Sequence, residues 1–243
     1  MELEKEIIVE MSLDKADFGR KITAKFIMEI LQKIATEHAD EHDFGYKVLS
    51  VQNKAWVLNK IKLEFNRSIA VGEKITFKTW PLAPKHYTAD RDYEAYDQSG
   101  EKIFKATSVW NLIDLEKRCL CSTDCIKDLK VSYHEKRAFE RAEFSRFKLD
   151  ESFNLEYSKT IRISDLDVNN HVNNTNYLTY ALDCLTTENY LKGIKVVEIR
   201  YSEELRINDA LDLYYKNQEN KHYIVGKKST GETVFYALIE TGE

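Results

Sequence analysis

The first strong pattern along the chain is helical. Between residues 22 and 39, apolar side chains recur every three or four positions, with charged and amide side chains between them. The apolar positions are Ile22, Phe26, Ile27, Ile30, Leu31, Ile34, Ala35 and Ala39, and His38 falls on the same stripe. This spacing predicts an amphipathic helix of about five turns. For His38 we expect a hydrogen-bonded core position, with a catalytic role as the alternative.

Alternating patterns follow this helix and predict antiparallel strands. Alternation covers residues 56–65, 75–79, 87–95 and 104–112. Its phase changes near Asn59, which suggests a β-bulge there. Turn signals separate the strands at residues 71–73 and 97–100. One long helix followed by a series of antiparallel strands indicates an α+β fold rather than a βαβ fold.

The second half of the chain repeats this order of elements. A helical pattern covers residues 173–190, and alternation follows at 195–205 and 211–215. The motif Gly-Glu-x-(Ile/Val)-Phe-x-Ala occurs at residues 100–106 and again at 231–237. A motif that recurs within a recurring order of elements predicts a tandem duplication. We expect domains at residues 1–125 and 159–243, joined by a charged linker with some helix at 126–158.

Composition excludes several classes of function. The 243 residues include only 8 Gly and 2 Pro, and no Gly-rich phosphate-binding motif is present. The net charge of -5 argues against general nucleic-acid binding. No run approaches 18 apolar residues, so no membrane-spanning helix is expected. The N-terminal residues are charged from Glu2 and lack the apolar core of a signal peptide, which predicts a cytoplasmic location.

The cysteines do not form a metal-binding pattern. Cys119, Cys121 and Cys125 cluster, and Cys184 stands apart. A structural zinc site uses four ligands, usually in C-x2-C pairs, and that spacing is missing. We therefore expect reduced structural thiols, and neither a metal nor a cofactor.

The most unusual stretch is residues 164–177, which is rich in Asp and Asn directly before a predicted helix. Helix capping by Asn173 or Asn174 explains one or two of these residues. It does not explain Asp167, Asn169 and His171, which alternate and are expected to share one face of an extended segment. A carboxylate, an amide and an imidazole would then lie beside a helix N-terminus, whose backbone N–H groups suit an oxyanion. The pattern predicts a catalytic site.

This segment resembles the signature of the acyl-acyl carrier protein thioesterases, the plant FatA/FatB type and their bacterial relatives. The motif is Asp-Val-Asn-x-His-Val-Asn-Asn-x-x-Tyr at residues 167–177. The resemblance covers nearly the whole chain, and in the first half it rests on Leu31-Gln32, His38, Trp56-Val57-Leu58, Thr79-Trp80, Arg91-Asp92-Tyr93 and residues 106–114. It implies two tandem hotdog domains, each a long helix wrapped by an antiparallel β-sheet. The implied activity is hydrolysis of fatty acyl-acyl carrier protein, which releases a free fatty acid and ends chain elongation in fatty acid biosynthesis.

The resemblance also implies which residues are catalytic. Asp167, Asn169 and His171 match the family's Asp, Asn and His, and Glu204 matches its Glu, with Glu203 as the alternative. Many plant members have a Cys directly after this Glu, where this chain has Leu205.

Cys184 is a possible but disfavoured substitute for that missing Cys. The expected reaction uses Glu204 or Asp167 as the general base for a water molecule. Asn169 and His171 orient the reactants, and backbone N–H groups near Asn174 bind the oxyanion.

An acyl chain needs an apolar tunnel, which the resemblance places largely in the first domain. The candidates are Phe26, Ile27, Ile30, Ile34, Trp56 and Phe65. The expected partner is an acidic acyl carrier protein, which needs a local basic surface. Candidates for that surface are Lys60, Lys62, Arg67, Arg91, Arg200 and Arg206. A monomer is plausible because a tandem hotdog pairs within one chain, and a homodimer is the alternative.

Three other functions stay open on the sequence alone. Hotdog enoyl-thioester hydratases use a pattern resembling Asp-x-Asn-Pro-x-His, but residues 167–171 lack the Pro and are one residue shorter. An acyl-coenzyme A thioesterase is the second alternative, because these residues do not distinguish acyl carrier protein from coenzyme A. A non-catalytic module that binds acyl-thioesters is the third alternative, and the intact set of candidate residues argues against it.

Overall fold

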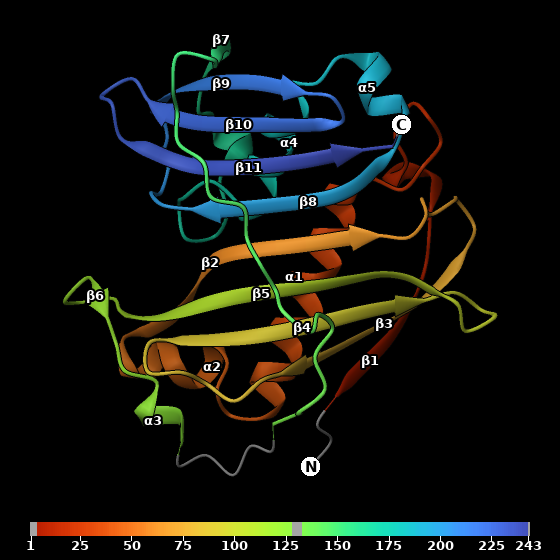
Figure 1. Ribbon diagram of the computed structural model, residues 1–243. Coiled ribbons are helices and arrows are strands. Elements are labelled where there is room, and N and C mark those ends of the chain that lie inside the picture. The colour runs from red at the N-terminus through yellow and green to blue at the C-terminus, as the bar shows by residue number, and fades with distance from the viewer. Residues whose placement is uncertain (1–3, 128–132, 243) are drawn as a thin grey trace. The chain divides into compact units, whose positions relative to one another are not determined.

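The computed structural model describes residues 4–127 and 133–242. Residues 128–132 of the predicted linker lie outside this description. The chain forms two compact units, Met1–Ala142 and Glu143–Glu243, which we call unit 1 and unit 2 (Figure 1). The division falls within the predicted linker. Each unit is an α+β arrangement of an antiparallel sheet and a helix, and the predicted fold class is confirmed.

Unit 1 contains a sheet with the strand order β1-β3-β4-β5-β2, and β6 pairs with β5. All the pairings named are antiparallel. The elements in chain order are β1 (Lys5–Glu10), the 3-10 turn η1 (Leu13–Lys15), α1 (Ala24–Glu41), α2 (Tyr46–Leu49), η2 (Ser50–Gln52), β2 (Lys54–Phe65), β3 (Lys74–Pro81), β4 (Thr88–Tyr96), β5 (Lys102–Asp114), β6 (Cys119–Leu120) and α3 (Asp124–Lys127).

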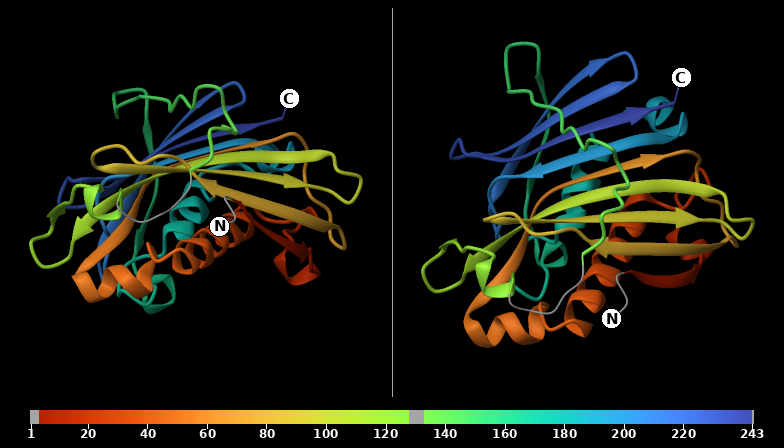
Figure 2. Two further views of the ribbon diagram at one scale, coloured as in Figure 1. Left: turned by 90° about the horizontal axis from the view of Figure 1, so that it is seen from below. Right: turned by 60° about the horizontal axis from the view of Figure 1, so that its bottom comes forward.

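Helix α1 confirms the first predicted helix and lies against one face of this sheet (Figure 2). It begins at Ala24 because the Thr23 hydroxyl accepts a hydrogen bond from the Phe26 backbone N–H, 3.2 Å away. The predicted bulge in β2 is also present, since its register against β5 shifts between Leu58 and Lys60. His38 is buried and lies 3.1 Å from the Arg91 guanidinium, measured from Nδ1 to Nη1, in a core position.

Unit 2 repeats the arrangement with a shorter helix. Its sheet has the order β8-β11-β10-β9-β7, again with antiparallel pairs. The elements are β7 (Asn154–Thr160), η3 (Ile163–Asp165), α4 (Asn174–Leu182), α5 (Thr187–Leu191), β8 (Ile194–Tyr201), β9 (Ala210–Gln218), β10 (Lys221–Lys228) and β11 (Thr233–Thr241). Helix α4 packs on the sheet through Tyr177, whose ring centroid lies 5.3 Å from that of Phe235.

One predicted helix, at residues 173–190, is wrong in its length. The structure has two helices there, with a break at residues 183–186. The break has a local cause, because the Thr186 hydroxyl accepts a hydrogen bond from the Asn189 backbone N–H and starts a new helix. The hydrophobic periodicity of the sequence continues across this cap, so the periodicity alone predicts one helix where the structure has two.

The predicted linker is more ordered than its composition suggests. Its last residues belong to β7, which begins at Asn154, and residues 133–153 contain no helix. Residues 133–142 pack on unit 1, where the Lys136 carbonyl accepts a hydrogen bond from Trp80 Nε1 at 2.9 Å. Residues 143–153 pack on unit 2, where the ring of Phe147 contacts Tyr223 and Tyr236 edge-on.

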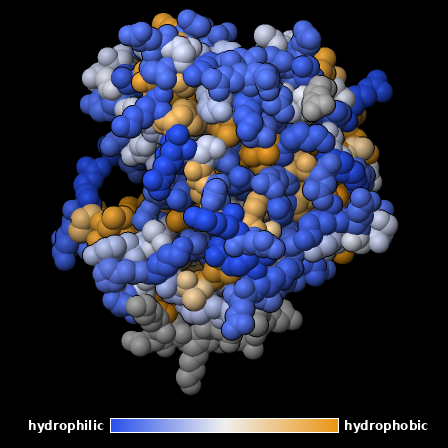
Figure 3. All heavy atoms as spheres, viewed as in Figure 1, coloured by the Kyte–Doolittle hydropathy of each residue, from blue (hydrophilic) through white to orange (hydrophobic). Residues whose placement is uncertain are grey.

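Among the described residues, no helix is long and apolar enough to cross a membrane. On the face shown in Figure 3 the side chains are mainly hydrophilic, and hydrophobic side chains appear between them in small groups.

Candidate functional site

The structure brings His171 and Glu204 together in unit 2. His171 Nε2 lies 3.2 Å from Glu204 Oε2. Both side chains reach solvent, with exposed fractions of 27% for His171 and 49% for Glu204. Arg206 is also near, with Nη2 3.9 Å from the same Glu204 oxygen. Glu203, the alternative from the sequence, makes no side-chain contact with His171 within the described residues, so the geometry favours Glu204.

Asp167 and Asn169 lie on the same loop as His171, but in a different conformation from the one expected. The chain reverses here, because the Asp167 backbone N–H donates to the His171 carbonyl at 2.8 Å. Asn170 has a φ of 62°, in the left-handed region that Asn tolerates. The expected extended segment is therefore wrong, and alternation does not place the three side chains on one face.

The carboxylate of Asp167 helps to shape this turn. Its Oδ1 accepts a hydrogen bond from the Asn169 backbone N–H at 2.8 Å. Asx turns of this kind fix short loops without secondary structure. In the described part of the chain, neither Asp167 nor Asn169 forms a side-chain hydrogen bond with His171 or Glu204. The loop thus holds three of the candidate residues, and one of them, His171, contacts Glu204 on the segment after β8.

The N-terminus of α4 follows this loop directly. The Asn173 side chain caps it, since Oδ1 accepts a hydrogen bond from the Thr175 backbone N–H at 2.9 Å. The Asn174 N–H makes no hydrogen bond within residues 4–127 and 133–242, as the first turn of a helix allows. It remains available for an oxyanion.

Two tyrosines that were not expected as site residues connect α4 to the segment that carries Glu204. The Tyr201 hydroxyl donates to the Asn174 carbonyl at 3.1 Å. The Tyr177 hydroxyl accepts from the Leu205 backbone N–H at 3.3 Å. Their rings meet edge-on at 5.4 Å. Tyr177 was part of the motif, so its position was a signal, but its partner Leu205 is distant in the sequence.

Unit 1 contains a second copy of the loop with the same backbone hydrogen bonds. The Asp17 N–H donates to the Lys21 carbonyl at 2.8 Å, as Asp167 does to His171. Arg20 is left-handed with a φ of 59°, like Asn170. This confirms that the two halves repeat at the level of individual hydrogen bonds.

The side chains of the two loops differ. Asp17 matches Asp167, but Gly19 and Lys21 stand where unit 2 has Asn169 and His171. The Ile22 N–H donates to the Ile69 carbonyl at 2.9 Å, and Val172 donates to Leu205 at the same distance. Ser68 therefore corresponds to Glu204. Unit 1 has the loop but not the imidazole, the amide or the second carboxylate.

The structure argues against Cys184 as a nucleophile. Cys184 is 2% exposed, and its Sγ contacts the Tyr180 carbonyl at 3.5 Å. Burial raises the pKa of this thiol, which disfavours the reactive thiolate. Leu205 is fully buried. No group of three or more His, Cys, Asp or Glu side chains suited to a metal ion occurs among the described residues.

The candidate acyl-chain residues occupy different parts of unit 1. Ile27, Ile30 and Ile34 are buried on α1. Phe65, at the end of β2, contacts the ring of Phe104 at 5.5 Å. Trp56 lies near the other end of β2 and donates from Nε1 to the Phe44 carbonyl at 2.9 Å. Phe26 is half-buried, under the ammonium group of Lys15 at 5.5 Å from the ring centroid.

Two of the cations proposed for a carrier-protein surface are committed elsewhere. Arg91 is 5% exposed and faces α1, so the expectation that it contributes to the surface is wrong. Arg67 pairs with Glu73 and Asp97. Arg206 is 51% exposed and lies beside Glu204, so it is adjacent to the candidate site.

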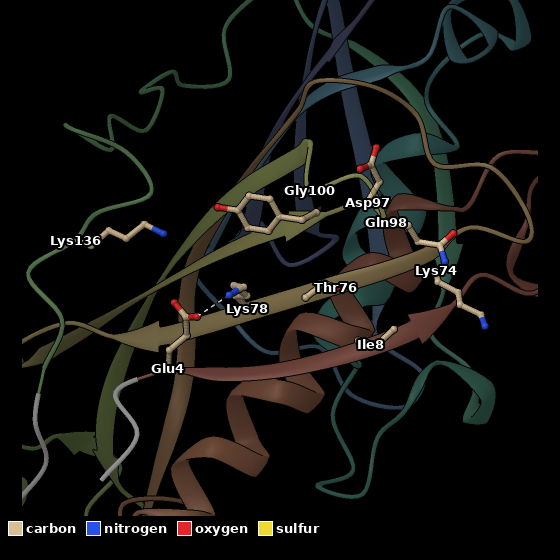
Figure 4. A pocket seen from close by; sticks show the side chains of 10 residues that line it. Glu4, Ile8, Lys74, Thr76, Lys78, Asp97, Gln98, Gly100 and Lys136 are labelled. Atoms are coloured by element: carbon tan, nitrogen blue, oxygen red, sulfur yellow. Dashed lines mark hydrogen bonds and ion pairs between the residues drawn. The ribbon is translucent and has the colours of Figure 1, made fainter.

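A surface pocket of about 580 Å³ in unit 1 is lined by β1, β3, β4 and Lys136 (Figure 4). It contains none of the candidate site residues. Its charges are largely paired, since Lys78 contacts Glu4 at 3.1 Å and Lys136 contacts Glu94. We therefore do not assign a substrate to it.

Comparison with known proteins agrees with this arrangement. Residues 6–128 match the acyl-ACP thioesterase N-terminal domain, and residues 148–239 match the acyl-ACP thioesterase C-terminal domain. Acyl-[acyl-carrier-protein] hydrolase FATB3 from Cuphea viscosissima is 28% identical over 79% of this chain and 50% of its own length. The oleoyl-acyl carrier protein thioesterase of Coriandrum sativum is 25% identical over 80% of this chain and 57% of its own. The chain spans about half the length of these relatives.

Solved structures extend the match to both units. An acyl-ACP thioesterase from Bacteroides thetaiotaomicron has a TM-score of 0.90 and 26% identity, covering 98% of this chain and 97% of its own. The 12:0-ACP thioesterase from Umbellularia californica shares the fold with a TM-score of 0.88 at 20% identity, covering 99% and 97%. With both domain models matched in order, the chain belongs to the acyl-ACP thioesterase family.

Proposed function

We propose that this protein hydrolyses the thioester of fatty acyl-acyl carrier protein and releases a free fatty acid. The observation that carries the proposal is that His171 Nε2, on the loop directly before the α4 N-terminus, lies 3.2 Å from Glu204 Oε2, on the segment after β8. Hydrolysis of a thioester needs an activated water and oxyanion donors. This site offers His171 with Glu204 as the general base and the backbone N–H of Asn174 as a donor. The names of the two plant relatives support the same reaction.

The reaction follows from the geometry of the pair. In the proposed reaction Nε2–H of His171 is directed to Glu204 Oε2, 3.2 Å away, and Nδ1 is then left as an acceptor that has no partner within the described residues. A water molecule there loses its proton to the pair as its oxygen attacks the thioester carbonyl carbon. The Asn174 N–H stabilises the resulting oxyanion. The tetrahedral intermediate then collapses and its C–S bond breaks. The departing thiolate takes up the proton held by His171 and Glu204, which leaves a fatty acid and a free thiol.

Asp167 and Asn169 complete the proposed site. The Asp167 carboxylate keeps one oxygen on the Asn169 N–H and has the other available to the water or to His171. The Asn169 side chain is exposed and orients the thioester. The acyl chain lies in unit 1 along the apolar side chains of Phe26, Ile27, Ile30, Ile34, Trp56 and Phe65. Arg206 attracts the acidic carrier protein.

The proposal is tested by thiol release from acyl carrier protein thioesters of about eight to eighteen carbons, with the wild type, Glu204→Gln and Glu203→Gln. We expect turnover by the wild type and a fall of about a hundredfold or more in kcat for Glu204→Gln, because general base catalysis contributes this much. Glu203→Gln is the matched control and should retain wild-type kcat.

The other outcomes identify the alternatives. Preference for coenzyme A thioesters would make the protein an acyl-coenzyme A thioesterase. Hydration of an enoyl-thioester without thiol release would make it a hydratase. Tight acyl-thioester binding with neither reaction would make it a binding module.

A further inference from the structure

Asp165 lies two residues before Asp167 and has no role in the proposed reaction, yet its side chain has three partners. Oδ1 accepts hydrogen bonds from the Tyr180 hydroxyl at 2.7 Å and from Lys159 Nζ at 2.9 Å. Oδ2 accepts from the Arg162 backbone N–H at 2.8 Å. The carboxylate thereby joins β7, the η3 turn and α4. Only 14% of the side chain is exposed.

The Asp165 backbone carbonyl extends this set of contacts to the far end of the loop. It accepts hydrogen bonds from the Asn173 N–H at 3.0 Å and from Asn176 Nδ2 at 2.9 Å. Asn173 follows the loop and caps α4. One residue therefore holds the start of the candidate loop, its end and the helix after it.

Unit 1 shows what the loop needs in order to fold. Lys15 stands in the position of Asp165, and its carbonyl accepts from the Thr23 N–H at 3.1 Å in the same way. Its side chain instead pairs with Asp14 and lies over the Phe26 ring. Ile30 replaces Tyr180. The loop forms in unit 1 with the same backbone bonds, so a loop of this kind can fold without side-chain contacts like those of Asp165.

The side-chain contacts of Asp165 thus occur in the copy that carries His171 and Glu204, and Lys15, at the same position of the other copy, does not make them. Hydrogen bonds also keep this carboxylate charged. Burial alone would raise the pKa of Asp165, but the bonds from Arg162, Tyr180 and Lys159 lower it below its usual range. A charged side chain that accepts three hydrogen bonds has little freedom to move.

We propose that Asp165, held by Tyr180 and Lys159, is a positioning residue that fixes the 167–171 loop against α4, so that His171 meets Glu204 in the reactive geometry. This inference rests on the proposed hydrolase function and adds a residue outside the reacting set. Small displacements of a catalytic group cost large factors in rate, so loss of this support should reduce kcat rather than binding.

The test measures kcat and KM for thiol release with Asp165→Asn and, separately, Tyr180→Phe. For each variant we expect kcat to fall by about tenfold to a hundredfold with little change in KM. Both substitutions retain nearly the same shape and volume, and circular dichroism checks that the fold is kept. Lys15→Met in unit 1 is the matched control and should leave both constants unchanged.

A double-mutant cycle separates positioning from a general loss of folded protein. Asp165→Asn is introduced into the Glu204→Gln background and the residual rate is measured. A positioning residue acts through the pair, so the second substitution should have little further effect. An equal fall in both backgrounds, or a wild-type kcat for Asp165→Asn and Tyr180→Phe, overturns the proposal. Absence of thiol release by the wild type is a different result, which refutes the proposed function itself.

Discussion

At the scale of single residues, the candidate site depends on the contact between one imidazole and one carboxylate. Glu203 and Glu204 are adjacent residues of the same type, but only Glu204 lies beside His171. In unit 1 the backbone places Lys21 and Ser68 at the corresponding positions. The proposed chemistry therefore depends on a few side chains of unit 2, on a loop and a neighbouring segment whose backbone hydrogen bonds recur in unit 1.

Another group of charges in unit 1 predicts how stability depends on pH. Arg67 contacts Glu73 through both Nη atoms, at 3.0 and 2.6 Å, and Asp97 at 3.1 Å. The hydrogen bond from Arg67 lowers the pKa of Glu73. The hydrogen bond from the Ser99 side chain, followed by that from Arg67, lowers the pKa of Asp97 to about 2.

A carboxylate whose pKa is lower in the folded than in the unfolded protein stabilises the fold above its unfolded pKa. This stabilisation is lost as the pH falls through the lower, folded-state pKa. We expect the urea midpoint of the wild type to decrease as the pH is lowered from about 5 to about 3. Arg67→Gln should reduce the slope of this decrease, and Lys33→Gln on the surface of α1 is the control. An unchanged slope in Arg67→Gln would show that this cluster does not cause the acid sensitivity.

At the scale of elements, the two β-hairpins with Gly-Glu turns are equivalent but packed differently. Gly226 on β10 lies opposite Phe235 on β11, next to a register shift between Gly226 and Lys227. A Cβ at Gly226 would overlap the Phe235 ring. In unit 1 the matching pair is Ala95 and Phe104. The Phe104 ring packs on Phe65 and Phe77, whereas that of Phe235 packs on Tyr177.

This difference predicts that Gly226→Ala destabilises the protein although Ala is tolerated in the other hairpin. We expect a loss of about 1–3 kcal/mol in the free energy of unfolding, typical of overpacking. The measurement is chemical denaturation. Combining Gly226→Ala with Phe235→Leu should make the Ala substitution less costly than it is alone, because the ring is gone. An equal cost in both backgrounds would contradict a steric cause.

Elements with strong periodicity could be predicted from the sequence, and those without it could not. Helix α1, the bulge near Asn59 and the Gly100 and Gly231 turns all follow from local patterns. β1 and β7 precede their helices as short strands at sheet edges and were missed.

The candidate site could likewise be predicted from the sequence only in part. Its residue types could be predicted from the motif and the resemblance. The turn at residues 167–171 could not, because an apparent alternation hid the left-handed Asn170. The contacts of Asp165 and Leu205 depend on tertiary packing, which no local pattern encodes.

At the scale of the whole chain, two units repeat one arrangement, and one complete set of candidate residues occurs within their described residues. Both family domains match in order, and the solved thioesterase from Bacteroides thetaiotaomicron aligns over 97% of its own length. The oligomeric state and the cytoplasmic location stay predictions. The net charge of -5 makes the position of Arg206 beside Glu204 relevant to an acidic partner. We therefore propose that unit 2 alone carries the catalytic residues.

The most direct test compares the two equivalent aspartates, Asp167→Asn and Asp17→Asn, by kcat for thiol release from acyl-acyl carrier protein. In both loops Asn retains an oxygen that can accept the backbone hydrogen bond made by Oδ1, so each substitution removes mainly the charge. We predict a fall of about a hundredfold or more for Asp167→Asn and wild-type turnover for Asp17→Asn. Equal effects of the two substitutions, or an unchanged kcat for Asp167→Asn, would contradict the assignment of catalysis to unit 2.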